Sequence, residues 1–478
     1  MNFLTLQFLW FFAVCLLLYY ALPGKTQNAL LLAANCLFYL CAGPSAGMWL
    51  LLAVSVSFFC ALAMVRGSHR QLWLSAGILA LFGSLFLFKY LNFFCRAFSL
   101  LAGRPAPSPF ELCLPIGVSF YSFTLAGYLF DVYGGKCGAE RNFLRFAAFA
   151  SFFPSLLSGP INRARELLPQ LVRPRRFSLE GFKEGFWRFL CGAGKKLVPA
   201  ALLAEIIDPA YAAPSEFSSG AWIVVACAYS LYIYVDFSAY SDMAAGAAKM
   251  LGLELMENFR APYLSRSVKE FWKKWHISLT SWFREYLYFP LGGSRKGELR
   301  TRLNILIVFA VSGVWHGAAF TFLVWGLLNG LFQTAGEWTM PLRRRLRAAL
   351  YIPENAWYAA AFQGVFTFGL ITAAWIFFRS RSLDQALFIV KRILLVFRDG
   401  PGNIMAVLPA IPLKGIVLSV CLALMIAEDV SIARGKVFPI AQTSFRFWIT
   451  AALLAAAVLV FGQYGPGFQN QDFIYFQF

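Results

Sequence analysis

The chain has three histidines, His69, His276 and His316, and these are its only imidazole groups. A histidine changes charge near neutral pH and can take a proton from a hydroxyl group, so chemistry of this kind has few candidates here. His69 lies in a polar turn between Arg66 and Arg70, where we expect it to be solvated. His276 and His316 are therefore the two histidines whose surroundings suit a reaction.

His316 lies within an apolar run over residues 304–331. Ionisable groups at membrane depth are costly and usually face a protein interior or a water-filled cavity. Gly313 and Gly317 are four residues apart, which places them on one helix face where another backbone or a substrate can approach closely. Two interpretations stay open: His316 stabilises packing between helices, or it removes a proton from an attacking hydroxyl group.

His276 lies in a segment, residues 267–289, that is predicted to form one amphipathic helix at the membrane interface. Ser267 and Glu270 have the spacing of a capping box at its start. Apolar residues then repeat at helical spacing: Val268, Phe271, Trp272, Trp275, Leu279, Trp282, Phe283 and Tyr286. This pattern places His276 beside the apolar stripe, facing inward. An interfacial anchor helix would look the same, so anchoring and catalysis both remain open.

Other reactive patterns are weaker. Asp236 and Asp242 are six residues apart, so they face different sides of a straight helix. We expect capping or ion pairing for both, with hydrogen bonding to a substrate as the alternative. No serine has the G-x-S-x-G context of a hydrolase nucleophile, and the ten cysteines include no C-x-x-C pair or metal-ligand spacing. We therefore expect neither a serine triad nor a bound metal.

The elements that position these residues are predicted to be membrane helices. Hydrophobic residues make up 59% of the chain and charged residues 14%, against roughly 25% charged in soluble proteins. At about 20 residues per span, the apolar segments predict an all-α polytopic membrane protein with about 11 to 13 transmembrane helices. Some segments are short or interrupted, one of them by Lys195 and Lys196, which favours additional re-entrant or interfacial helices.

The net charge of +19 comes largely from short basic runs between the apolar segments. Such runs are typical of cytoplasmic loops that contact anionic lipids. We therefore expect membrane lipids, and no nucleic acid, among the binding partners.

Four stretches of the sequence resemble the membrane-bound O-acyltransferase family, in its bacterial branch of alginate O-acetyltransferases and teichoic-acid D-alanyl transferases. They are LPIGVSFYSFTLAGYLFDVYGGK (114–136), FFPSLLSGPINRARELLPQL (152–171), the segment 236–295, and VSGVWHGAAFTFLVWGLLNG (311–330). The resemblance implies a ring of transmembrane helices around a tunnel that crosses the membrane. It also suggests three sections: N-terminal transmembrane helices (1–105), a catalytic core (106–335), and C-terminal transmembrane helices with an aromatic tail (336–478).

The resemblance further implies an enzyme of the bacterial cytoplasmic membrane. It would move an acyl group, acetyl in the first instance, from a cytoplasmic thioester toward hydroxyl groups of a cell-surface polysaccharide. His316 matches the histidine that the family treats as catalytic and would be the general base, while His276 would orient donor or acceptor. The donor, acetyl-coenzyme A or the phosphopantetheine of an acyl carrier, would be a substrate and not a bound cofactor. The expected substrate-binding residues are Trp272, Trp275, Arg284, Trp315, Asp236 and Asp242.

The sequence ends on the aromatic hexapeptide FIYFQF. It resembles the terminal motif of the small membrane partner in D-alanylation systems, so Tyr475 is a candidate acyl relay, with simple packing as the alternative. The expected partners are the acyl donor and either a cell-surface glycan or an extracytoplasmic accessory protein, acyltransferase or esterase-like. Two other functions stay open: D-alanyl transfer to teichoic acid, and a transporter or flippase, although no inverted repeat is visible.

Overall fold

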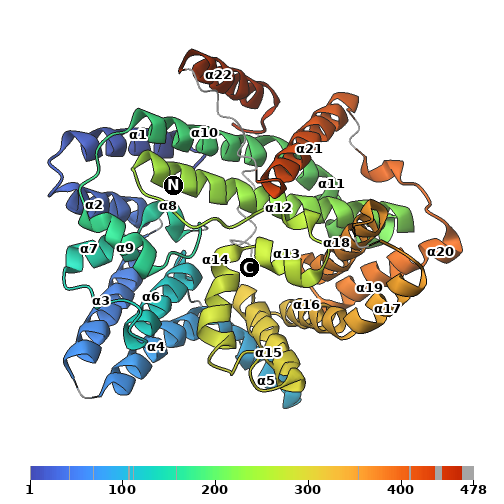
Figure 1. Cartoon of the computed structure of the whole chain (residues 1–478), viewed down its shortest axis with the longest axis horizontal. Coiled ribbons are helices and arrows are strands. Elements are labelled where there is room, and N and C mark those ends of the chain that lie inside the picture. The colour runs from blue at the N-terminus through green and yellow to red at the C-terminus, as the bar shows by residue number, and fades with distance from the viewer. Residues whose placement is uncertain are drawn as a thin grey trace. The chain divides into compact units, whose positions relative to one another are not determined.

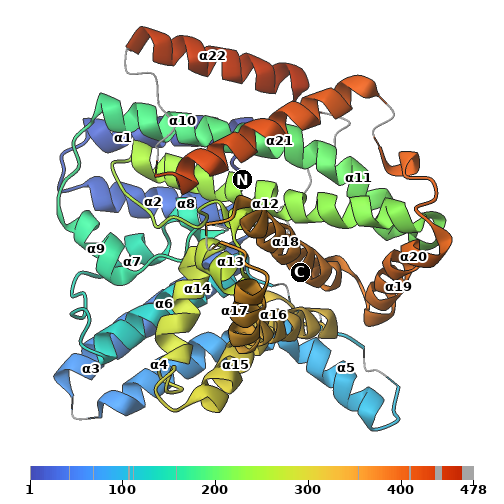
Figure 2. The same ribbon diagram turned by 45° about the vertical axis from the view of Figure 1, so that its right-hand side comes forward.

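The computed structural model of the chain consists of helices and loops, with no β-strand in the part that it describes (Figure 1, Figure 2). The described residues are 2–41, 43–67, 69–105, 108–110, 112, 114–157, 159–353, 355–408, 411–435 and 444–465. The all-α fold class predicted from the apolar composition is confirmed.

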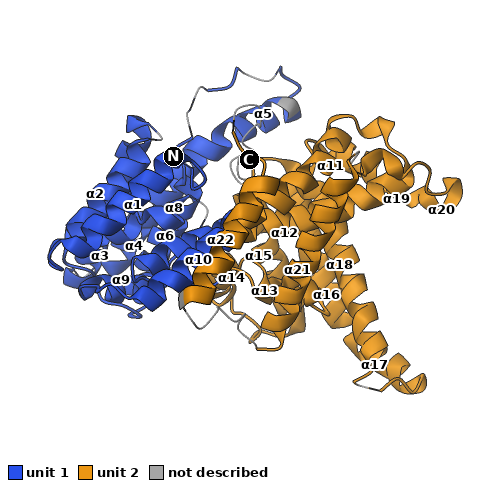
Figure 3. Cartoon of the chain, turned by 90° about the horizontal axis from the view of Figure 1, so that it is seen from above, with its two compact units in different colours: residues 1–193, 240–257 blue, residues 194–239, 258–478 orange. Residues whose placement is uncertain are grey.

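The chain forms two compact units, which Figure 3 colours separately. Unit 1 contains residues 1–193 and 240–257, and unit 2 contains residues 194–239 and 258–478. One long helix, α12 (Ser219–Met250), contributes to both units. The division into sections 1–105, 106–335 and 336–478 stays a prediction.

Unit 1 is built from the N-terminal helices, some of which begin with a side-chain cap. For example, the hydroxyl of Thr5 accepts a hydrogen bond from the backbone N–H of Phe8 at 3.2 Å, which satisfies one of the unpaired donors at the start of the first helix. The helices of this unit are α1 (Leu6–Ala21), α2 (Gln27–Leu40), α3 (Pro44–Arg66), α4 (Arg70–Leu85), η1 (Phe86–Tyr90), α5 (Leu91–Leu101), α6 (Val118–Tyr133), α7 (Phe143–Ala150), α8 (Phe153–Leu156), α9 (Ala164–Val172) and most of α10 (Leu179–Lys195).

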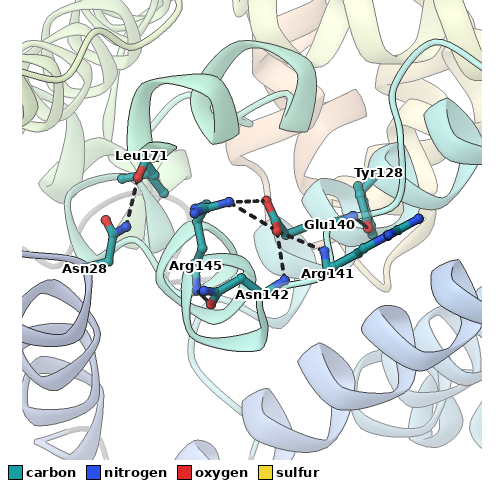
Figure 4. Close-up of polar contacts among 7 residues, drawn as sticks. All are labelled: Asn28, Tyr128, Glu140, Arg141, Asn142, Arg145 and Leu171. Atoms are coloured by element: carbon teal, nitrogen blue, oxygen red, sulfur yellow. Dashed lines mark hydrogen bonds and ion pairs between the residues drawn. The ribbon is translucent and has the colours of Figure 1, made fainter. Parts of the chain in front are cut away.

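The loop between α6 and α7 is fixed by the carboxylate of Glu140, as Figure 4 shows. This carboxylate accepts hydrogen bonds from the backbone N–H groups of Arg141 and Asn142 at 2.9 and 2.8 Å, and it pairs with Arg145 at 3.2 Å. The side chain of Asn142 in turn caps α7 by accepting from the N–H of Arg145 at 3.0 Å. The polar turn is therefore ordered by charge-assisted bonds, although it connects two apolar helices.

Unit 2 holds both histidines of interest. Its elements are η2 (Lys196–Ala200), α11 (Ala201–Ala212), η3 (Pro214–Glu216), α12 as far as Ala239, η4 (Pro262–Leu264), α13 (Val268–Lys274), α14 (Ile277–Phe283), η5 (Arg284–Tyr288), α15 (Glu298–His316), α16 (Phe320–Trp338), α17 (Met340–Ala349), α18 (Trp357–Arg379), α19 (Leu383–Leu394), α20 (Val396–Asp399), η6 (Met405–Val407), α21 (Pro412–Ala433) and α22 (Ser444–Phe461).

Five helical stretches of the described chain are long and apolar enough to cross a membrane, judged by length and composition. They are Pro44–Arg66, Arg70–Ser99, Ser219–Met250, Trp357–Arg379 and Pro412–Ala433. Three shorter apolar helices are Leu6–Ala21, Gln27–Leu40 and Phe445–Phe461. The predicted total of about 11 to 13 spans therefore depends on shorter helices. That total and the predicted tunnel remain predictions.

The apolar run over residues 304–331 is two helices and not one. Helix α15 ends at His316 and α16 begins at Phe320. Between them Gly317 is extended, with φ of −164° and ψ of 155°, and a Cβ there would lie 2.1 Å from the ring of Phe322. The chain can turn here because glycine leaves room for that ring. Gly317 lies beyond the end of the helix that holds Gly313, so the expectation that the two glycines share one helix face is wrong.

The close approach predicted at Gly313 does occur. A Cβ at Gly313 would lie 2.4 Å from the carbonyl oxygen of Phe322, and one at Gly326 would lie 2.3 Å from the carbonyl oxygen of Phe309. The two glycines therefore let α15 and α16 pack backbone against backbone.

The segment 267–289 is also not a single helix. It consists of α13, α14 and the π-helical turn η5, and His276 lies between the first two. The predicted capping at its start is confirmed, since the hydroxyl of Ser267 accepts from the N–H of Glu270 at 3.2 Å. Apolar periodicity did not reveal the break, because the aromatic residues on both sides of it are buried in the same core.

Lys195 and Lys196 do not interrupt their helix. The helical backbone runs from α10 through the π-helical turn η2 into α11. Nζ of Lys196 lies 2.6 Å from Oδ1 of Asp236, and Nζ of Lys195 lies 3.2 Å from Oε2 of Glu428. Each charge therefore has a carboxylate partner inside unit 2, which allows two adjacent lysines within an apolar helix.

Candidate active site

His316 is the last residue of α15 and is 4% exposed. Its Nδ1 lies 2.6 Å from the carbonyl oxygen of Ser312, one helical turn earlier. Because a carbonyl oxygen can only accept a hydrogen bond, this contact assigns the proton to Nδ1. Nε2 then carries the lone pair of the neutral imidazole, which is the form that can accept a proton from a hydroxyl group.

Aromatic rings surround the imidazole of His316. The ring centroids of Trp315 and Trp325 each lie 4.8 Å from that of His316, and Phe378 of α18 lies 5.5 Å away. Trp325 also stacks on Trp375, with centroids 5.5 Å apart and an interplanar angle of 20°. These rings exclude bulk water from the imidazole, and electrostatic interactions made in such a setting are stronger than in water.

His276 connects α13 to α14 with φ of 44° and ψ of 53°, in the left-handed region that residues other than glycine rarely adopt. Backbone hydrogen bonds hold this turn from both sides. The N–H of Arg260 donates to the carbonyl of Lys274 at 3.1 Å, and the N–H of Ile277 donates to the carbonyl of Asn258 at 3.0 Å. Strained conformations persist where the surrounding structure fixes them, and they cluster at functional sites.

The side chain of Asn258 contacts the same turn. Its Oδ1 accepts from the hydroxyl of Ser278 at 2.6 Å and from the N–H of Ser278 at 3.3 Å, and it lies 3.4 Å from Nδ1 of His276. Asn258 and His276 are each 1% exposed. With the proton of His276 on Nδ1, facing this oxygen, the lone pair is again on Nε2.

The structure brings both histidines close to Trp315. The centroid of the Trp315 ring lies 6.4 Å from that of His276 and 4.8 Å from that of His316. Phe237 of α12 packs edge-on against His276 at 4.7 Å. His276 lies outside the five long apolar stretches. Burial holds the pKa of His276 well below its usual range, and the charge that the nearby His316 carries when it is protonated lowers this pKa further, so the imidazole of His276 is neutral at physiological pH.

Trp272 and Trp275 belong to the same aromatic cluster. Nε1 of Trp272 donates to Oδ1 of Asn329 at 3.2 Å, and its ring lies 5.7 Å from that of Trp325. The ring of Trp275 lies 5.3 Å from that of Trp375. Their predicted contact with a substrate stays a prediction.

The sequence of the segments that form this site is similar to that of known proteins. The pattern of the MBOAT, membrane-bound O-acyltransferase, family matches residues 138–379, a range that contains both histidines and the aromatic rings around them. The chain belongs to the membrane-bound O-acyltransferase family. It is accordingly an O-acyltransferase and a multi-pass membrane protein, so the transporter alternative is set aside.

Three proteins with similar sequences carry the names of different acyl transfer activities. The chain is 37% identical over 389 residues to a probable alginate O-acetylase, AlgI, of Pseudomonas putida, an alignment that covers 79% of this chain and 76% of the relative. It is 31% identical over 417 residues to a peptidoglycan O-acetyltransferase of Helicobacter pylori, covering 80% and 77%. It is 24% identical over 265 residues to a teichoic acid D-alanyltransferase of Bacillus subtilis, covering 53% and 66%.

The two aspartates of the acyltransferase form separate ion pairs, as their spacing suggests. Asp236 is fully buried and pairs with Lys196 in unit 2. Asp242 accepts from Nε of Arg188 at 3.0 Å in unit 1. These contacts fit the expected ion pairing, and hydrogen bonding to a substrate stays untested. Arg284 begins η5 with an exposed side chain.

Two further residues were singled out from the sequence, His69 and Tyr475. His69 is exposed just before α4, as expected for a solvated turn. Tyr475, the candidate relay, lies outside the described residues.

Sequence reasoning missed Asn258, Trp325 and Phe378 as neighbours of the histidines. Asn258 and Trp325 both lie in stretches that resemble the family. Trp325 follows His316 by nine residues, and only a turn between the two helices brings their rings together. A signal for that turn is present in the pair Gly313 and Gly317, since glycine allows both a close backbone contact and a turn.

Proposed function

We propose that this acyltransferase moves an acetyl group from a cytoplasmic thioester donor to hydroxyl groups of a cell-surface polysaccharide, with His316 as the general base. The observation that carries the proposal is the 2.6 Å contact between Nδ1 of His316 and the carbonyl of Ser312. This contact favours the tautomer whose lone pair is on Nε2, the nitrogen that would accept the proton.

In this mechanism Nε2 of His316 takes the hydroxyl proton while the hydroxyl oxygen attacks the carbonyl carbon of the thioester. The tetrahedral intermediate then collapses, the carbon–sulfur bond breaks, and the imidazolium returns the proton to the departing thiolate. General-base assistance of this kind contributes about 10²–10⁴-fold to the rate.

His276 has the supporting role of orienting or polarising the donor or the acceptor. Its imidazole is neutral, so one ring nitrogen can form a hydrogen bond to the substrate while the protein buries no charge there. Asn258 holds the turn at His276 in place. The thioester donor is acetyl-coenzyme A or an acyl carrier's phosphopantetheine, both of which are anionic. Residues 260–295 carry seven basic and two acidic side chains, which favours attraction of such a donor, although anionic lipid headgroups would be attracted equally.

The choice of acetyl rests on the relatives. Those at 36–37% identity are named as probable alginate O-acetylases, and one at 31% is named as a peptidoglycan O-acetyltransferase. The D-alanyltransferases match at 24–25% over 53–55% of this chain. We therefore propose O-acetylation of a cell-envelope polysaccharide, with the acetyl group handed over directly or through an extracytoplasmic accessory protein.

The experiment is acetyl transfer by the purified protein from a thioester that carries labelled acetyl. We expect His316→Ala to lose about 10²–10⁴-fold in rate, and His276→Ala to be impaired. The third histidine supplies the matched control, because His69→Ala alters only an exposed turn and should transfer normally. Normal turnover by His316→Ala would overturn the assigned base, and a preference for a D-alanyl thioester would overturn the choice of acetyl.

An acyl relay through Tyr475 is a separate proposal, carried by the resemblance of FIYFQF to the D-alanylation motif. Tyr475→Phe should then abolish transfer without unfolding the protein. Tyr464→Phe is the control, since the hydroxyl of Tyr464 donates to the nearby carbonyl of Leu459. Full activity of Tyr475→Phe would exclude the relay.

A further inference from the structure

Trp325 carries a hydrogen-bond donor that the protein does not use. The residue is 1% exposed, and its Nε1 has no acceptor within the described part of the chain. A buried donor without a partner destabilises the folded state, so such groups are rare and call for an explanation. A substrate atom that is present only during turnover would supply the missing acceptor.

Other buried tryptophans of unit 2 show that the fold can satisfy this group. Nε1 of Trp272 donates to Oδ1 of Asn329 at 3.2 Å. Nε1 of Trp222, on α12, donates to the carbonyl of Pro214 at 3.1 Å. Nε1 of Trp375, which stacks on Trp325, also has no acceptor among the described residues, but it is the indole of Trp325 whose ring centroid lies 4.8 Å from that of His316.

The indole of Trp325 is held firmly in that position. It stacks on Trp375, and it contacts Phe378 at 5.1 Å and Trp272 at 5.7 Å between ring centroids. The next residue, Gly326, lies against the backbone of α15. A donor fixed in this way needs little reorganisation when charge develops beside it, which is the requirement for stabilising an oxyanion.

We propose that Nε1 of Trp325 donates a hydrogen bond to the carbonyl oxygen of the acyl thioester and to the oxyanion that this oxygen becomes. The inference rests on the proposed function, because it places the reacting carbonyl beside His316. As the new carbon–oxygen bond forms, the hydroxyl proton passes to Nε2 of His316 and negative charge collects on the former carbonyl oxygen. The oxyanion then re-forms the carbon–oxygen double bond, the carbon–sulfur bond breaks with its electron pair leaving on sulfur, and the thiolate takes the proton from His316.

The distances allow both contacts at one reacting centre. The rings of His316 and Trp325 are 4.8 Å apart. A reacting centre beside His316 therefore also lies beside Trp325, where one hydrogen bond of about 3 Å would join Nε2 to the attacking oxygen and another would join Nε1 to the carbonyl oxygen. Apolar rings around both groups strengthen the bond to the oxyanion.

The test compares two variants. Trp325→Phe keeps an aromatic ring and removes the N–H. Trp222→Phe makes the same change at a tryptophan whose N–H is already bonded to Pro214 and which is distant in sequence from His316. Each purified variant is given acetyl-coenzyme A and its dithioester analogue, in which sulfur replaces the carbonyl oxygen and accepts hydrogen bonds poorly. We expect Trp325→Phe to lower kcat with acetyl-coenzyme A by about 10²–10³-fold and to lower it much less with the dithioester. Trp222→Phe should keep the kcat of the wild type with both donors.

Two results would overturn the inference. One is normal kcat for folded Trp325→Phe. The other is an equal loss with both donors, because that result would show disturbed packing around His316 and no bond to the carbonyl oxygen. The assignment of His316 as the general base is tested separately. Normal turnover by His316→Ala would overturn that assignment, whatever the activity of Trp325→Phe.

Discussion

Oδ1 of Asn258 lies 3.4 Å from Nδ1 of His276 and 2.6 Å from the hydroxyl of Ser278, so one carboxamide holds both the imidazole and the start of α14. The turn that it holds has a positive φ at a residue other than glycine. Such a conformation costs of order 1–3 kcal/mol and persists only where neighbouring groups fix it.

The first prediction concerns this carboxamide. Asn258→Ala should lower kcat by about tenfold, equivalent to ~1.4 kcal/mol, because His276 loses the group that orients it. It should also lower the free energy of unfolding by about 1–3 kcal/mol, since the Ser278 donors lose their acceptor. Ser278→Ala is the control, because it removes one hydroxyl and leaves Asn258 beside His276. Turnover and thermal unfolding in detergent check both effects, and an unchanged kcat for Asn258→Ala would contradict the orienting role.

The second prediction concerns pH. The folded-state pKa of His276 lies well below its usual value of about 6.5. Between these two values the unfolded chain binds a proton that the folded chain does not, so the free energy of unfolding is highest above about pH 6.5 and falls as the pH drops below it. We expect His276→Gln to flatten the change in unfolding temperature between pH 8 and pH 5. His69→Gln removes an exposed histidine and should leave the profile unchanged, whereas equal profiles for wild type and His276→Gln would show that His276 is not held neutral.

The third prediction concerns the contact of α15 with α16. A methyl group at Gly313 would lie 2.4 Å from a backbone oxygen of α16, so Gly313→Ala must push the helices apart and move Trp325 from His316. We expect a loss of stability of about 1–3 kcal/mol together with a lower kcat. Gly336→Ala, on the partner helix α16, is the control. Its added Cβ meets no atom within 4 Å, so this change should stabilise the protein by up to about 1 kcal/mol. Normal activity of Gly313→Ala would show that this close approach is not needed.

The same helix pair shows what the sequence reveals and what it does not. The scarcity of polar residues in apolar surroundings was enough to select His276 and His316, and the glycine spacing was enough to predict a close backbone contact. The left-handed turn at His276 was not predictable, because it is fixed by hydrogen bonds from residues 258–260, which no periodicity links to 274–278. Phe378 was missed for a similar reason, since its place beside His316 depends on how α18 packs and not on local pattern.

The last prediction concerns the buried pair of Lys196 and Asp236, whose charged atoms are 2.6 Å apart. Lys196→Met should lower the free energy of unfolding by about 3–5 kcal/mol, because it leaves a buried carboxylate without its partner. The double variant Lys196→Met/Asp236→Leu removes both charges and should recover most of that loss. Lys195→Met is the control, since its partly exposed pair with Glu428 should contribute no more than about 1 kcal/mol.

Activity of the double variant decides between the two roles left open for Asp236. Phe237, the next residue, packs on His276, so an ion pair that only anchors this part of α12 should be replaceable by apolar packing. A double variant that regains both stability and acetyl transfer would show that Asp236 is structural. One that regains stability but not transfer would show that the carboxylate, although paired with Lys196, also contacts the substrate.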